Sequence, residues 1–222
     1  MINSLITTDK LCIFLLLNIF FTRDFYGREI NTNQRSVRQK NSITENPCNL
    51  NNSWKIKPSY LLFQDKTFRK ILGNGDFMIS TEVDFSIVKP LYFFAELGYL
   101  RAKGYSIPSH ILVSLQMIPF SLGLKGIFPI KSSLSLYIKA GPNWIGLKEN
   151  SDYIYFKHGV FKYTFGATSG AGLLIHVYEN FFLDLFTNFI YGRKSYIDKY
   201  SNIRIKRYFG GFQFGAGLSF SY

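Results

Sequence analysis

The chain has 222 residues, which is enough for one domain, or for one domain preceded by a leader and a linker. Aromatic residues make up 18% of it, yet its mean hydropathy is close to zero and no internal segment reaches the roughly 20 apolar residues of a membrane-spanning helix. This combination argues against a helical membrane protein, and the formal net charge of +12 is compatible either with an anionic partner or with ordinary solvated loops.

The amino-terminal part of the sequence predicts export. Residues 11–21 form an apolar run interrupted only by Asn18. That length suits the core of a signal peptide and is too short to cross a bilayer as a helix. We predict a signal peptide over residues 1–27, with a buried amphipathic segment as the alternative. Residues 28–53 are rich in Asn, Gln, Ser, Thr, Arg and Lys, so we predict a disordered periplasmic linker there.

From residue 54 onward, large apolar side chains alternate with polar or small ones, which predicts strands. The predicted strands are residues 54–64, 77–87, 91–101, a segment ending near 128, 134–141, 162–177, 183–191 and 208–222. The fourth strand has an ambiguous start, because Pro119 cannot donate to a ladder. In the eighth strand, Phe214, Leu218 and Phe220 share one face with the terminal Tyr222, while glycines and serines share the other.

The lengths of the predicted connections predict the topology. Long connections alternate with short ones: 103–110, 147–161 and 192–207 are long, and 89–90, 129–133 and 178–180 are short. This alternation is typical of an up-and-down barrel with long outer loops and short periplasmic turns. The predicted fold is therefore an all-β, antiparallel up-and-down eight-stranded transmembrane β-barrel over residues 54–222. A soluble barrel with an apolar lumen is the alternative.

The inward faces of the predicted strands carry opposite charges. An eight-stranded barrel is only just wide enough for side chains to fill its interior, so these charges are expected to meet. The predicted lumen ion-pair network consists of Glu82, Asp84, Glu96, Lys125, Lys139 and Asp184, with Lys55 and Lys57 nearby. We expect this network to close the lumen. A narrow channel for protons or small ions is the alternative.

The sequence offers no convincing catalytic or metal site. His110 follows Ser109, but adjacent residues on a strand point to opposite faces, which makes a poor dyad. His158 and His176 are expected in surface or packing roles, and no Cys and His spacing suggests zinc. We expect no enzyme and no cofactor, with a barrel enzyme that modifies outer-membrane lipid as the alternative.

Basic residues cluster in the last predicted outer loop. They are Arg193, Lys194, Lys199, Arg204, Lys206 and Arg207. Arg and Lys at an outer rim suit lipopolysaccharide phosphates or acidic host and cell-surface ligands. Nucleic acid is not expected, because it leaves the aromatic stripes unexplained. Ordinary solvated loops are the alternative.

Residues 54–222 resemble the small eight-stranded outer-membrane protein families, such as OmpX, the OmpA transmembrane domain and the opacity-type surface proteins. Residues 118–129, 136–142 and 210–222 carry the resemblance, the last ending in an aromatic residue. The resemblance implies a monomer in the bacterial outer membrane with a structural or surface-interaction role. It transfers no catalytic residue.

Overall fold

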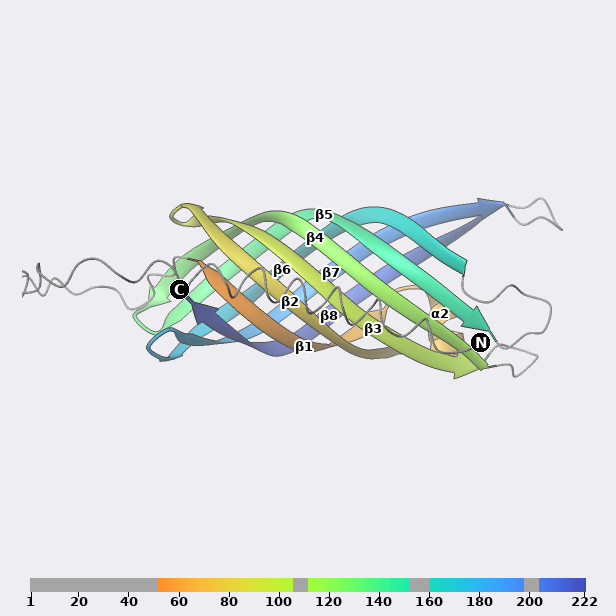
Figure 1. Cartoon of the computed structure of the whole chain (residues 1–222), viewed down its shortest axis with the longest axis horizontal. Coiled ribbons are helices and arrows are strands. Elements are labelled where there is room, and N and C mark those ends of the chain that lie inside the picture. Colours follow the sequence, from red (N-terminus) through yellow and green to blue (C-terminus); the bar gives the residue numbers. More distant parts are fainter. Residues whose placement is uncertain (1–51, 106–111, 152–159, 198–203) are drawn as a thin grey trace, which may run out of the picture. The chain divides into compact units, whose positions relative to one another are not determined.

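A computed structural model describes residues 52–105, 112–151, 160–197 and 204–222. Its elements are β1 (Ser53–Phe63), α2 (Lys66–Leu72), β2 (Gly75–Val88), β3 (Leu91–Tyr105), β4 (Leu112–Lys131), β5 (Leu134–Ser151), β6 (Val160–Tyr178), β7 (Phe181–Ile197) and β8 (Arg204–Ser221). The strands form a closed antiparallel barrel in chain order, in which β8 pairs with β1 (Figure 1). The predicted barrel is confirmed. The predicted signal peptide and residues 28–51 of the predicted linker lie outside the described residues, and Ser53, the last residue of the predicted linker, already belongs to β1.

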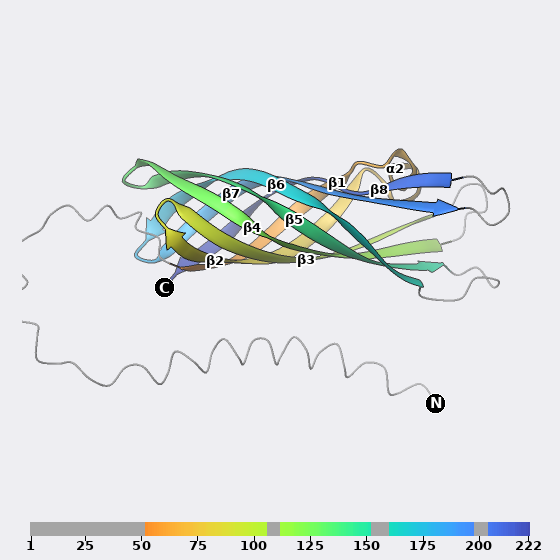
Figure 2. The same ribbon diagram turned by 90° about the horizontal axis from the view of Figure 1, so that it is seen from above.

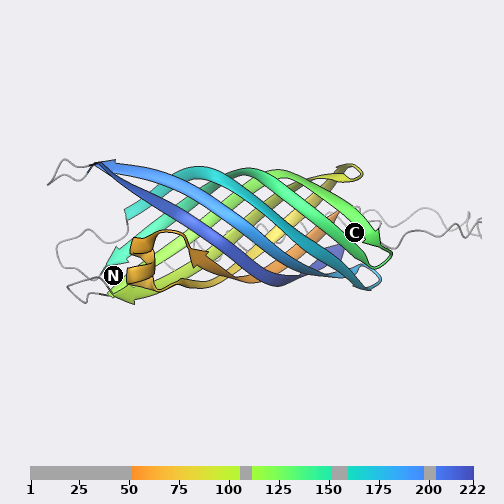
Figure 3. The ribbon, with the colours of Figure 1, turned by 180° about the vertical axis from the view of Figure 1, so that it is seen from behind.

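The barrel has two unlike ends (Figure 2). The turn end carries the connections β2–β3, β4–β5 and β6–β7, together with the carboxyl terminus. There the backbone N–H of Tyr222 donates to the carbonyl of Asn52 at 3.0 Å, so the last residue adjoins the start of β1. The opposite end, which carries α2, is called the helix end (Figure 3).

The strands run further toward the helix end than the sequence predicted. Residues 101–105, 147–151 and 192–197 are strand, although they were assigned wholly or partly to outer connections. Much of the predicted loop 192–207 is therefore wrong, because β7 pairs with β8 as far as Ile197 and Arg204. Backbone pairing does not depend on alternating hydrophobicity, which fades where the outward side chains meet water.

β4 passes through Pro119 and continues without a break in the strand. The β3–β4 pairing nevertheless skips two positions there, between the pairs Leu97 with Phe120 and Leu100 with Met117. A proline has no N–H to donate, so it removes one ladder hydrogen bond. This explains why the sequence left the start of the strand ambiguous.

Helix α2 was not predicted. It begins after Asp65, whose carboxylate accepts hydrogen bonds from the N–H groups of Thr67 (2.7 Å) and Phe68 (3.4 Å). It ends at Gly73, whose φ of 89° suits glycine. The sequence does contain a signal for this helix, because Asp65 is a suitable N-cap and Gly73 follows it eight residues later as a suitable C-cap. No helix among the described residues is long and apolar enough to cross a membrane.

Candidate functional site

A layer of buried charged side chains crosses the lumen. Its members are Lys55 and Lys57 on β1, Glu82 and Asp84 on β2, Glu96 on β3, Lys125 on β4, Lys139 on β5 and Asp184 on β7. This group, called the charged layer, contains every residue of the predicted network, and its lysines and carboxylates balance. Alternation of side chains places all of them inside.

Glu82 lies at the centre of the charged layer. Its Oε2 accepts a hydrogen bond from the Nζ of Lys57 at 2.9 Å and another from Lys139. Its Oε1 accepts from Lys125 and lies 3.3 Å from the Nζ of Lys55. One fully buried carboxylate therefore faces lysines from three strands.

The other carboxylates complete the layer. Asp84 Oδ2 lies 2.9 Å from the Nζ atoms of both Lys55 and Lys125. The hydroxyl of Tyr137 donates to Asp184 at 2.8 Å, and the Nζ of Lys125 lies 4.1 Å from the centre of the Tyr137 ring. Opposite charges and aromatic faces thus surround the buried lysines, which offsets the cost of removing them from water.

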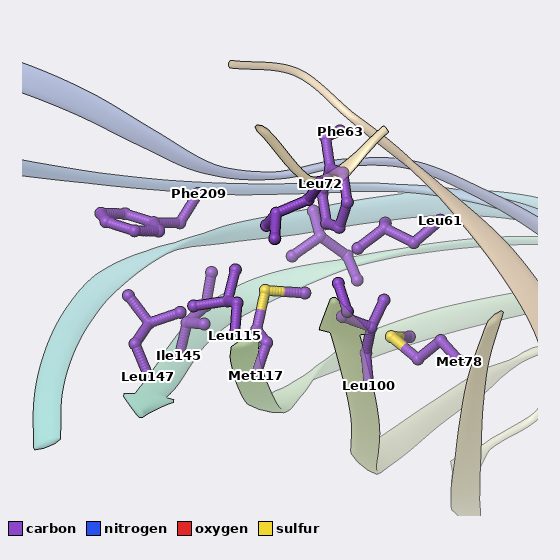
Figure 4. Close-up of a cluster of buried hydrophobic side chains, with 12 residues drawn as sticks. Leu61, Phe63, Leu72, Met78, Leu100, Leu115, Met117, Ile145, Leu147 and Phe209 are labelled. Atoms are coloured by element: carbon purple, nitrogen blue, oxygen red, sulfur yellow. The ribbon is translucent and has the colours of Figure 1, made fainter. Parts of the chain in front are cut away.

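Apolar side chains fill the lumen on both sides of the charged layer. At the helix end lie Leu61, Phe63, Leu72, Met78, Leu100, Ala102, Leu115, Met117, Ile145, Leu147, Ile190 and Phe209, called the helix-end cluster (Figure 4). At the turn end lie Tyr92, Ile127, Tyr137, Leu174, Phe182 and Phe186. Sequence reasoning missed both clusters. The sequence signal that could have revealed them is that the inward-facing positions near both ends of the strands are apolar.

The largest side chains in the described lumen, among them Tyr137, Lys55 and Phe94, are fully buried. A cavity of about 10 Å³ lies beside Ser80, Glu96 and Ser121. It has room for about one water molecule. The side chains around it therefore meet with little free space.

The exterior of the barrel is apolar. Phe214 and Leu218 on β8 are 48% and 67% exposed, and they have no protein layer over them in the described part of the chain. Aromatic rings meet on this surface, with Trp144 5.3 Å from Phe165 and Phe181 5.2 Å from Phe220 between ring centres. An apolar outside around a charged inside is the arrangement of a barrel that spans a membrane.

The predicted basic contact residues are placed differently from one another. Arg193 is exposed on β7, and Lys194 donates to the carbonyl of Tyr163 at 2.8 Å. Arg207 lies against α2, where its guanidinium is 3.7 Å from Asp65 and donates to Thr67. Arg204 and Lys206 lie on β8, and Lys199 lies outside the described residues.

Further basic side chains, not singled out from the sequence, are exposed toward the helix end. Arg101 and Lys103 lie on β3, and Lys148 lies on β5. Helix α2 adds Lys66, Arg69 and Lys70. The basic surface therefore extends over several strands instead of lying on one loop.

The histidines do not form a site within the described residues. His176 lies near the turn end, where its Nε2 is 2.7 Å from the carbonyl oxygen of Glu179 and its ring is 5.1 Å from that of Phe182. Ser109, His110 and His158 lie outside the described residues. Among the residues that are described, no group of His, Cys, Asp and Glu side chains could hold a metal.

No protein-family model and no curated protein sequence matches the chain. Similar solved structures include Neisserial surface protein A, with a TM-score of 0.49 and 18% identity over 77% of this chain and 97% of that one. Ail, the attachment invasion locus protein of Yersinia pestis, in complex with the heparin analogue sucrose octasulfate, has a TM-score of 0.48 and 15% identity over 76% and 97%. The N-terminal β-barrel domain of Pseudomonas aeruginosa OprF has a TM-score of 0.42 and 18% identity over 78% and 99%.

Proposed function

We propose that the chain is a sealed barrel of the bacterial outer membrane that acts through the basic surface of its helix end. Spanning the hydrocarbon takes about 9–11 residues of a tilted strand. Strands β4 to β8 have 17 to 20 residues. Several residues of each strand therefore stand in or beyond the headgroup region. The helix end faces the exterior and the turn end the periplasm, because short turns are typical of the periplasmic side.

One observation carries the proposal, namely the order of side chains along the outward faces. On β3, the exposed Tyr99 is followed on the same face by Arg101 and Lys103. On β5, the exposed Trp144 is followed four residues later by Lys148. Tyr and Trp favour the membrane interface, so these basic side chains reach the level of the headgroups.

Arg193 repeats this order on β7, two residues beyond Tyr191. We call Arg101, Lys103, Lys148 and Arg193 the basic collar. Arg and Lys at this level suit phosphate groups, with Arg able to make two parallel hydrogen bonds. The proposed partner is therefore a phosphate-bearing lipid of the outer leaflet, such as lipopolysaccharide. Acidic surface polymers also carry anionic groups, which the basic residues at the strand tips would bind in the same way.

The test removes the collar charges by changing all four residues to Gln. Each basic side chain near an anionic membrane surface contributes about 1 kcal/mol, so the lipopolysaccharide retained per purified barrel should fall at least about tenfold. The control is Lys89→Gln with Lys131→Gln, which removes two exposed charges at the turn end and is compared with the collar pair Arg101→Gln and Lys103→Gln, which removes the same number.

A second measurement distinguishes the two sources of anionic groups. Heparin, a soluble polyanion, is titrated against the barrel in nanodiscs at low and high salt. Loss of lipopolysaccharide retention with unchanged heparin binding assigns the collar to lipid phosphates. Unchanged retention in the collar variant contradicts the proposal.

A further inference from the structure

Helix α2 lies at the helix end of the lumen and packs apolar side chains into it. Leu72 belongs to the helix-end cluster, and Phe68 and Ile71 pack against it. The ring of Phe68 lies 5.3 Å from that of Phe209 and 6.4 Å from that of Phe63. Figure 4 shows Leu72 and Phe63 beside the side chains of the strands. The space beneath α2 is lined by apolar groups, unlike the polar interior usual for membrane barrels.

The helix itself is a weak structural element. It has seven residues, and a helix of this length is not stable without tertiary contacts. Its backbone approaches β3 closely, because a Cβ on Gly104 would lie 1.8 Å from the carbonyl oxygen of Ile71. The helix is therefore held by its contacts with the barrel and not by its own stability.

A polar clasp holds α2 at the rim. The carboxylate of Asp65 accepts a hydrogen bond from the N–H of Tyr208 at 3.3 Å and faces the guanidinium of Arg207 at 3.7 Å. Arg207 also donates to the hydroxyl of Thr67. The Arg207 side chain is one-third exposed, at 33%, so it is reachable from solution.

The segment 65–72 thus presents one carboxylate to an arginine at the rim and three apolar side chains to the cluster below. An anionic single-chain amphiphile has the same combination of groups. We infer that α2 is a lid, and that the helix-end cluster is a binding site for such an amphiphile, of the fatty-acid type. The ligand's carboxylate would replace that of Asp65 beside Arg207, and its chain would replace Phe68, Ile71 and Leu72.

The charged layer sets the depth of this site. Directly beneath the cluster lie polar side chains, including Ser59, whose hydroxyl accepts from Gln213 at 2.9 Å, and then the ion pairs around Glu82. A hydrocarbon chain gains nothing by displacing them. The inference is independent of the basic collar, whose residues take no part in it.

The experiment uses photolabelling, because surrounding lipid also dissolves fatty acids. Protein in nanodiscs is illuminated with dodecanoate that carries a diazirine at the chain end, and labelled residues are mapped by mass spectrometry. The expected result is label on inward residues such as Leu115 and Met117, which excess dodecanoate removes. Label confined to outward residues such as Ile118 and Phe120 would overturn the inference.

Two single variants separate the lid from the ligand contact. Asp65→Asn keeps a good helix cap but removes the charge that holds Arg207, so inward labelling should rise severalfold. Arg207→Gln breaks the same clasp, so labelling by the matching dodecanol probe should rise as in Asp65→Asn, whereas labelling by the dodecanoate probe should be roughly tenfold lower than that by dodecanol, as expected for the loss of one charge-assisted pair. Equal effects on both probes would overturn the carboxylate assignment.

A crosslinked variant tests the motion of the lid within one protein. Phe68→Cys and Phe209→Cys are introduced with Cys12→Ser and Cys48→Ser, and a short thiol crosslinker then joins α2 to β8. Inward labelling should disappear on crosslinking, while the heat-modifiable gel migration that reports a folded barrel stays the same. Inward labelling that survives the crosslink would show that the ligand reaches the cluster without movement of α2, which overturns the assignment of α2 as a lid.

Discussion

Glu82 illustrates how a single side chain organises the barrel interior. Its carboxylate is fully buried and faces the four lysines of the charged layer. In the low dielectric of the lumen, each lysine depends on nearby negative charge to offset its lost hydration. Removing this carboxylate leaves the lysines in excess.

Glu82→Gln is therefore expected to destabilise the barrel by about 3–5 kcal/mol, the cost of breaking a buried ion pair by removing one partner. Urea unfolding of the protein in lipid vesicles measures the change. The control is Glu179→Gln at the exposed turn end, which should stay within about 0.5 kcal/mol. Equal effects of the two substitutions would contradict a structural role for the layer.

The sequence could predict which charges lie inside but not which of them meet. Alternation along β2 and β5 assigns Glu82 and Lys139 to the inward faces, and this assignment is confirmed. Their contact crosses the lumen between strands that are not neighbours, and it depends on barrel stagger, which alternation does not encode. The partner of Arg207 could not be predicted either, because Asp65 caps helix α2, and the alternating strand pattern gave no indication of a helix there.

At the scale of elements, α2 depends on the glycine that it crosses. A Cβ at position 104 would overlap the carbonyl of Ile71, whereas at Gly126 the nearest atoms would be the ring of Phe128 at 3.0 Å. The two glycines lie on neighbouring strands, but backbone cannot yield as a ring can. The same substitution should therefore have different consequences at the two sites.

Gly104→Ala is expected to push α2 outward and to speed trypsin cleavage after Arg69 and Lys70, because a protease needs an unfolded site. Limited proteolysis in nanodiscs, followed by mass spectrometry, measures the rate. Gly126→Ala should leave the rate near that of the unsubstituted protein. If both variants are cut at the unsubstituted rate, the contact between α2 and β3 does not hold the helix.

The existence of the strands was predictable, but their full lengths were not. Where lipid covers the outward face, apolar side chains recur every second residue, as in β8 from Phe212 to Phe220. Toward the helix end the outward face accepts charged residues, as at Lys148 and Arg193, while the inward face becomes apolar, so the alternation of the lipid-covered part is lost while hydrogen bonding continues. The surface proposed to contact partners is therefore the part that pattern reading recovers least well.

For the whole molecule, the lumen is a stack of three layers. Apolar side chains at each end enclose the charged layer, and the cavity of about 10 Å³ beside Glu96 has room for about one water. An ion crossing this stack would have to displace both packed clusters and the ion pairs between them. The sealed barrel proposed above therefore predicts that the described lumen offers no conducting path.

Purified protein in planar bilayers is accordingly expected to give no stepwise conductance at neutral pH, in membranes where an added general porin gives clear steps. Glu82→Gln, which disturbs the charged layer but neither apolar cluster, should remain silent as well. Regular current steps from the unsubstituted protein would favour the channel alternative.

The hydrogen bond between Tyr222 and Asn52 brings the two ends of the barrel segment together, so the order of the strands along the chain can be changed without changing which strands pair. Because the two residues touch, a short Gly-Ser link between them should allow new termini to be opened elsewhere, for example between Ser132 and Ser133 in the turn after β4. Such a circular permutant, made from residues 52–222, is expected to refold into detergent micelles with the same strand neighbours. The first and last strands of the natural chain would then become an ordinary hairpin, and the junction between β4 and β5 would become the closing seam.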